Sequence, residues 1–156
     1  MAIVIIRQDH KIELWKKALL KADSSLEVYS FLEEHPKDEI TMAITWKHPS
    51  GSLSKYPNLK CIASAGAGVD YLFEDATRPK NIPITRIVDP FLASDMSEHV
   101  LAVILAHLKN LNVYKAKQIA NVWQPMEYLR IKDVTIGILG LGELGALTGS
   151  DLTRFG

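Results

Sequence analysis

The clearest chemical pattern in the chain is the segment Gly140-Leu141-Gly142-Glu143-Leu144-Gly145, whose glycines have the spacing G-x-G-x-x-G. An apolar run of strand length, Val134 to Leu139, comes before it, and a segment suited to a helix follows. In such a unit the first glycine allows a tight turn, the second lets a pyrophosphate approach the backbone, and the third allows close helix packing. The phosphates would bind N–H groups at the start of the helix, near Glu143. The pattern favours a dinucleotide site, and the alternative is a tight β-to-α turn without a ligand.

The rest of the dinucleotide unit does not fit into the remaining sequence. A complete β-α-β unit takes about 30 residues, and the residue that contacts the adenosine ribose lies about 20 residues after the glycines. Gly156 is reached before either length is complete. We therefore expect this chain to contain only the first strand and helix of its cofactor domain, preceded by a different domain.

Composition excludes several classes of function. The 156-residue chain is 47% hydrophobic and 23% charged, and its 18 basic and 18 acidic side chains leave a net charge of zero. The basic residues do not cluster along a face, so a nucleic-acid partner is not expected. The apolar run at residues 1–6 is too short for a signal peptide, and no stretch approaches the roughly 18 apolar residues of a membrane span. The single cysteine, Cys61, cannot form an internal disulfide, as expected for a cytoplasmic protein.

The segments before the glycine motif alternate between strand and helix patterns. Residues 11–22 carry Ile12, Trp15 and Leu19 at helical spacing, and residues 53–56 suit a short helix. This alternation predicts an α/β fold with a parallel sheet and helices on both faces, which binds ligands at the carboxyl ends of its strands. The loops at those ends would be residues 8–10, 46–50 and 65–70. The predicted strands are residues 2–6, 26–29, 41–46, 59–64 and 82–88.

After these strands the pattern changes to long helices. Asp89-Pro90 marks the change, and Asp95 with Glu98 has the spacing of a capping box. Residues 96–111 are apolar on most sides, so we expect a buried helix that joins two domains and packs beneath the nucleotide sheet. A more polar helix is predicted for residues 114–123.

Two segments of the first part could do chemistry, and the residues alone leave both open. In the loop from Ala65 to Asp70, two glycines flank one alanine beyond a strand end, which suits either an anion-binding nest or a simple tight turn. His48 could act as an acid, but a His-Pro pair in a loop usually belongs to a turn, and no positioned carboxylate partner is evident. His99 and His107 are eight residues apart and form no metal-ligand pair, so no metal site is expected.

With these residues in place, the chain resembles the N-terminal half of a D-isomer-specific 2-hydroxyacid dehydrogenase of the glyoxylate/hydroxypyruvate reductase A type. The combination of the Gly-Ala-Gly-Val-Asp loop, the Met-Ser-Glu-His-Val helix segment and the glycine motif, in this order, is more specific than any one of them. The resemblance extends over nearly all of the chain, in four segments: residues 45–49, 57–70, 82–100 and 134–145.

The resemblance implies a fold and an activity. The fold would be a flavodoxin-like substrate domain, residues 1–93, followed by residues 94–156 as linker helices and the truncated start of a Rossmann NAD(P)-binding domain. The active site of such enzymes lies in the cleft between the domains. There a nicotinamide, from NAD or NADP, passes hydride to C2 of a small 2-oxo acid such as glyoxylate or hydroxypyruvate. A histidine protonates the alkoxide, a glutamate orients that histidine, and an arginine holds the substrate.

The resemblance also assigns roles to residues of this chain. Trp46 would wall the substrate pocket, and Met96 would lie near the nicotinamide. The substrate carboxylate would accept hydrogen bonds from the backbone of Gly66, Ala67, Gly68 and Val69. The pyrophosphate would be held by Gly140, Gly142, Glu143, Leu144 and Gly145.

No catalytic residue can be carried over. In the family the catalytic arginine, glutamate and histidine lie well after the glycine motif, where this chain offers only Asp151 and Arg154 as charged residues. We therefore expect the full-length enzyme to be a 2-hydroxyacid dehydrogenase and the 156-residue chain alone to be inactive.

Two alternatives remain. The chain could be a non-catalytic α/β module that self-associates, because the unpaired apolar strand at residues 134–139 favours pairing with a second copy, which predicts a homodimer. A methyltransferase-like nucleotide domain is a weaker alternative. In such a domain the glycine motif follows the first strand of the main sheet, whereas here it follows a long α/β segment.

Overall fold

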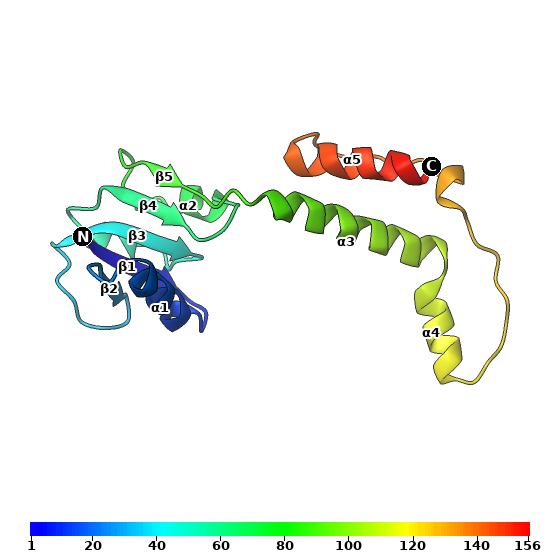
Figure 1. The fold of residues 1–156 in the computed structure, drawn as a ribbon, viewed down its shortest axis with the longest axis horizontal. Coiled ribbons are helices and arrows are strands. Elements are labelled where there is room, and N and C mark those ends of the chain that lie inside the picture. The colour runs from blue at the N-terminus through cyan, green and yellow to red at the C-terminus, as the bar shows by residue number, and fades with distance from the viewer. The chain divides into compact units, whose positions relative to one another are not determined.

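The computed structural model describes residues 1–156, which form two compact units, Met1–Val88 and Asp89–Gly156 (Figure 1). The first unit is a five-stranded sheet with the order β2-β1-β3-β4-β5, and every neighbouring pair of strands is parallel. This is the strand order of flavodoxin-like folds. The predicted α/β class is therefore confirmed. The strands are β1 (Ala2–Arg7), β2 (Glu27–Ser30), β3 (Ile40–Trp46), β4 (Cys61–Ser64) and β5 (Ile84–Thr85).

The core of this unit forms around β1, the strand between β2 and β3. All six residues of β1 are buried, as expected for a parallel strand that is covered on both faces. The helix α1 (Ile12–Ala22) connects β1 to β2 and places Ile12, Trp15 and Leu19 against the sheet, as their spacing predicts. The short helices η1 (Leu53–Lys55) and α2 (Asp70–Glu74) follow β3 and β4 respectively.

The second unit is helical. It contains α3 (Pro90–Leu108), α4 (Leu111–Ile119), the short helix η2 (Ile131–Asp133) and α5 (Glu143–Phe155). Helices α3 and α5 pack side by side, and the buried Ser97 hydroxyl donates a hydrogen bond to Asp151 Oδ2 at 2.7 Å. The predicted division after residue 93, and the assignment of the second part to a cofactor domain, stay predictions.

The helix boundaries correct two sequence-based expectations. Helix α3 begins at Pro90, and the Asp89 carboxylate caps it by accepting a hydrogen bond from the Phe91 amide at 2.9 Å. Asp95 therefore lies inside the helix and does not cap it. Proline at the first helical position has its φ already set for a helix, which explains the earlier start. Helix α4 likewise begins at Leu111 instead of residue 114.

Helix α3 is less buried than its apolar sequence predicts. Only Ala93, Ser97 and Leu108 are buried within the chain, because α5 covers one face of the helix and the expected sheet is not formed. By length and composition alone α3 could cross a membrane, which corrects the expectation that no stretch approaches that length. Core helices of soluble proteins meet the same criterion, so this finding is weak evidence for a membrane span.

Two predicted strands also differ from the structure. Residues 134–139 are not paired with any strand, because the chain contains no neighbouring strand in this unit. Their side chains still alternate between half-buried and exposed, with Val134, Ile136 and Ile138 on the inner side. The fifth strand contains only Ile84–Thr85 of the predicted residues 82–88.

Candidate substrate and cofactor sites

The predicted substrate residues lie at the carboxyl ends of β3 and β4, where the parallel sheet rule places ligands. Trp46 is the last residue of β3, and its indole ring covers the backbone of Gly66. A Cβ on Gly66 would overlap the ring and lie 2.7 Å from Cε3 and 2.9 Å from Cη2 of Trp46. The structure thus brings Trp46 and Gly66 together, and it gives a steric reason for glycine at this position.

The loop after β4 is tied back to the sheet by one buried serine. Ser64 Oγ lies 3.0 Å from the carbonyl oxygen of Gly66 and 3.2 Å from that of Gly68, and it accepts a hydrogen bond from the Gly66 amide at 3.3 Å. The amides of Ala67, Gly68 and Val69 form no hydrogen bond within the chain. Three of the four predicted carboxylate donors are therefore available, whereas the Gly66 amide is already engaged.

Tyr71 connects the ends of the two strands. Its hydroxyl lies 2.9 Å from both the carbonyl oxygen and Oγ1 of Thr45, and 3.1 Å from Ser64 Oγ. Its ring packs edge-on against Trp46, with 5.9 Å between the ring centroids. No sequence pattern pointed to Ser64 or Tyr71, because a serine at a strand end and a tyrosine in a short helix are common residues.

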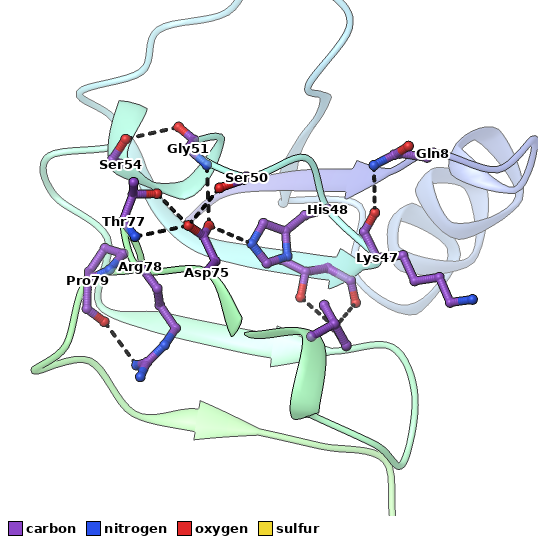
Figure 2. Close-up of polar contacts among 12 residues, drawn as sticks. Gln8, Lys47, His48, Ser50, Gly51, Ser54, Asp75, Thr77, Arg78 and Pro79 are labelled. Atoms are coloured by element: carbon purple, nitrogen blue, oxygen red, sulfur yellow. Dashed lines mark hydrogen bonds and ion pairs between the residues drawn. The ribbon is translucent and has the colours of Figure 1, made fainter. Parts of the chain in front are cut away.

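His48 has a carboxylate partner, which corrects the sequence-based expectation. Its Nε2 donates a hydrogen bond to Asp75 Oδ2 at 3.0 Å, and both side chains are almost fully buried (Figure 2). The His48 ring also packs edge-on against Tyr71, and its Nδ1 is buried without a partner. Only 1% of the His48 side chain is exposed, so His48 is not positioned to protonate a substrate. Its hydrogen bond to Asp75 instead stabilises the loop after β3.

Asp75 is the centre of this second network. Besides His48, the carboxylate accepts hydrogen bonds from the Ser50 hydroxyl, the Gly51 amide, and both the amide and the hydroxyl of Thr77 (Figure 2). Burial alone would raise the pKa of Asp75. The hydrogen bonds from Thr77, His48 and Gly51 outweigh burial and hold the pKa of this carboxyl well below its usual range.

The remaining predicted ligand loop, residues 8–10, is held by hydrogen bonds to neighbouring residues of the same chain. The buried Arg7 guanidinium donates two hydrogen bonds to the Asp9 carboxylate, at 2.9 and 2.7 Å, and lies over the Trp15 ring. The Arg7 hydrogen bond holds the pKa of Asp9 well below its usual range. Gln8 donates to the carbonyl oxygen of Lys47. Arg7 is thus paired within the chain and does not present a free guanidinium to a substrate carboxylate.

The glycine motif has the geometry that its spacing predicts. Gly140 has a φ of +93°, so this tight turn requires glycine. A Cβ on Gly145 would overlap the Gly140 carbonyl oxygen and lie 3.3 Å from Ile138 Cγ2, so the helix packs closely on the turn. No atom lies within 4 Å of a Cβ placed on Gly142, so the backbone there is open to a bulky group. These features fit a pyrophosphate.

The remaining cofactor residues lie in the same unit. Glu143 and Leu144 form the first turn of α5, which has no side-chain cap on its free N–H groups. Met96 lies on α3 and is 40% exposed. The roles of these residues toward a cofactor stay predictions. The substrate residues all belong to Met1–Val88 and the cofactor residues to Asp89–Gly156.

Known proteins resemble this chain in sequence and in fold. No protein-family model matches it. A glyoxylate/hydroxypyruvate reductase A from Yersinia enterocolitica is 33% identical over 119 residues, which cover 73% of this chain and 38% of that protein. The chain therefore spans less than half of this relative, and all of the chain aligns with 51% of a Klebsiella pneumoniae reductase of the same name at 28% identity.

Solved structures agree with these relatives. The NADPH-dependent glyoxylate/hydroxypyruvate reductase from Sinorhizobium meliloti, in complex with NADP and sulfate, has a TM-score of 0.84 and 30% identity over 99% of this chain and 50% of that one. A probable 2-hydroxyacid dehydrogenase from Rhizobium etli, in complex with NADP, HEPES and L(+)-tartaric acid, has a TM-score of 0.79 and 30% identity over 99% and 49% of the two chains.

The fold, the site geometry and the similarity to known proteins all point to the same class of enzymes. The chain is a relative of the D-isomer-specific 2-hydroxyacid dehydrogenases and corresponds to about half the length of its members. Within this class, the curated relatives that it matches are glyoxylate/hydroxypyruvate reductases A. The family resemblance found in the sequence is thus confirmed.

Proposed function

We propose that this chain is part of an NAD(P)-dependent 2-hydroxyacid dehydrogenase that reduces a small 2-oxo acid of the glyoxylate or hydroxypyruvate class. The observation that carries the proposal is the loop after β4, where the amides of Ala67, Gly68 and Val69 have no partner in the chain. Free backbone N–H groups in a loop beyond a strand end can bind a carboxylate. We assign Trp46, whose ring lies against Gly66, to the wall of this site.

The glycine motif supports the cofactor part of the proposal. The turn at Gly140, the open backbone at Gly142 and the uncapped start of α5 would together hold the pyrophosphate of NAD or NADP. When bound, the nicotinamide would supply the hydride that reduces C2 of the 2-oxo acid. Glu143, Leu144, Gly145 and Met96 are the further residues that we assign to cofactor binding.

The 156-residue chain alone should have no reductase activity. After Gly145 its only charged residues are Asp151 and Arg154, so it offers no glutamate or histidine there for acid-base catalysis. Residues 134–139 also have no neighbouring strand, whereas dinucleotides bind across the carboxyl ends of several parallel strands. Turnover of glyoxylate with NADPH by the purified chain, measured as loss of nicotinamide absorbance, would contradict this expectation.

Carboxylate binding can be tested on this chain directly. We would titrate the ¹⁵N-labelled chain with glycolate and, as a matched uncharged ligand, with glycolamide. A half-site of neutral amides should bind glycolate weakly, with a Kd of about 1 mM or more, which is about −4 kcal/mol. The amide resonances of Ala67, Gly68 and Val69 should shift with glycolate and saturate. Equal shifts with glycolamide, or none with glycolate, would refute the carboxylate site.

We further propose a cytoplasmic location and no membrane partner. The support is a single cysteine, the family of the relatives, and the packing of α3 against α5 within the chain. Fractionation of cells that express the tagged chain tests this proposal. Recovery with the membrane fraction after a high-salt wash would contradict it.

A second candidate is a non-catalytic module that self-associates to a homodimer. It is favoured by the unpaired residues 134–139 and by the exposed apolar surface of α3, where Phe91, Met96 and Val103 are exposed. An unpaired extended segment offers a row of N–H and C=O groups to a second copy. The mass of the chain in solution tests this candidate.

A further inference from the structure

The hydroxyl of Tyr71 lies where the ends of β3 and β4 meet. It has one proton, which it can donate to the Thr45 carbonyl oxygen at 2.9 Å or to Ser64 Oγ at 3.1 Å, and it can accept one from Thr45 Oγ1 at 2.9 Å. Thr45 and Ser64 are both buried. The hydroxyl therefore fixes the relative position of two strand ends and the orientation of the Ser64 side chain.

Ser64 passes this constraint on to the loop. Its hydroxyl has one proton, which it can donate to the Gly66 carbonyl oxygen at 3.0 Å or to the Gly68 carbonyl oxygen at 3.2 Å. The Gly66 carbonyl oxygen also accepts a hydrogen bond from the Ile87 amide at 3.2 Å. These two carbonyls share peptide groups with the amides of Ala67 and Val69, so a Ser64 hydrogen bond to either carbonyl turns the N–H of that peptide away from Ser64. The orientation of the free Val69 amide thus depends on Ser64, that of the Ala67 amide depends on Ser64 together with Ile87, and the orientation of Ser64 depends on Tyr71.

The Tyr71 ring supports the other part of the site. It packs edge-on against the Trp46 indole, at 5.9 Å between centroids, and against the His48 ring at 5.6 Å. Trp46 in turn covers Gly66. One side chain therefore supports the loop through its hydroxyl and the pocket wall through its ring, so substitution can separate the two effects.

We propose that Tyr71 is a positioning residue for recognition of the substrate carboxylate, acting through Ser64 on the free amides of Ala67 and Val69. This inference rests on the proposed function. The Tyr71 hydroxyl itself is occupied by Thr45 and Ser64, so it acts on the geometry of the loop and does not contact the ligand.

The test is the glycolate titration repeated on variants of the 156-residue chain. Tyr71→Phe removes the hydroxyl and keeps the ring, so glycolate binding should weaken about fivefold to tenfold, the loss expected for one hydrogen bond. Tyr56→Phe is the matched control, because it also removes a tyrosine hydroxyl from a hydrogen bond, here with His35 Nε2 at 3.1 Å, outside the site. Both variants lose stability, and only the first should lose affinity.

A double-mutant cycle distinguishes positioning from general destabilisation. If Tyr71 acts through Ser64, then Tyr71→Phe should weaken glycolate binding much less in a Ser64→Ala background than in the wild type. If Tyr71→Phe does not fold, Thr45→Val removes one hydrogen bond to the same hydroxyl and should weaken binding in the same way. Full additivity of the two losses would contradict the proposal.

The outcomes separate this proposal from the function on which it rests. If the wild-type chain does not bind glycolate, the carboxylate site itself is wrong. If the wild type binds and Tyr71→Phe binds equally well, the site stands and the positioning role of Tyr71 is wrong.

Discussion

Gly66 has no room for a side chain, because the Trp46 indole lies against its backbone. Gly66→Ala must displace the ring, so we expect the free energy of unfolding to fall by about 1–3 kcal/mol, the usual cost of overpacking. Gly68→Ala is the matched control, since its added Cβ would lie 3.6 Å from Asp70 Oδ2, an ordinary contact. Urea unfolding at pH 7 measures both. Equal losses would show that the ring moves away freely.

Asp75 makes stability depend on pH in a defined direction. Its pKa is held below the unfolded value, so its contribution is complete above about pH 3.9 and is lost as the pH falls toward the folded-state pKa. Asp75→Asn removes that contribution and leaves donors from Thr77 and Gly51 without an ionised acceptor. At pH 7 we expect a loss of about 1–3 kcal/mol.

The measurement for Asp75 is urea unfolding between pH 7 and pH 2. The difference between wild type and Asp75→Asn should shrink as the pH falls below about 4. Asp38→Asn is the control, because the Asp38 side chain forms no hydrogen bond or ion pair, and it should keep the wild-type pH profile. A difference that stays constant over the whole range would mean that Asp75 acts through packing alone.

The sequence predicts part of the candidate site at this scale, and physical reasons limit the rest. Trp46 and Gly66 follow from motifs at two predicted strand ends, and the structure brings them together. The His48–Asp75 pair was missed because the partners are 27 positions apart and only the folded sheet makes them neighbours. Tyr71 was missed because its role depends on three-dimensional distances to Thr45 and Ser64, which no local spacing encodes.

The start of α3 offers a test at the scale of one element. Asp89→Ala removes the side-chain cap on the Phe91 amide and should cost about 1 kcal/mol of local helix stability. Hydrogen exchange of the Phe91 amide should therefore become about fivefold faster. Asp95→Ala is the control, because Asp95 lies inside the helix, and it should leave that rate unchanged. The reverse pattern would restore the capping box that the sequence suggested.

Elements with their own local signal were predicted well, and those that need a partner were not. The apolar run of β1 and the periodic face of α1 each indicate one conformation, and both elements formed as expected. Residues 134–139 have the composition of a strand, but a strand also needs a neighbour, and the chain supplies none there. Helix α3 is exposed for the same reason, since the predicted sheet above it is not formed.

At the scale of the whole molecule, the alternation of strand and helix patterns predicts the α/β class of the first unit, and the flavodoxin-like type is what the family resemblance implies. The observed order β2-β1-β3-β4-β5 is the flavodoxin-like one. The conformation of the second unit depends on which element covers its apolar surface. Helix propensity and hydrophobic periodicity do not specify that element. Association of two chains is one way to cover that surface.

Self-association through residues 134–139 would depend on their backbone N–H groups. Alternate N–H groups of an extended segment point to opposite edges, so Gly137→Pro disables one edge and Ile136→Pro the other. Gly137→Ala is a clean control, because no atom lies within 4 Å of the added Cβ, and Ile136→Ala controls for the lost side chain. Sedimentation velocity over a range of concentrations should show a dimer for the wild type. One proline variant should shift toward the monomer while its alanine control does not. A monomeric wild type, or dimers that persist in both proline variants, would remove strand pairing as the basis of association.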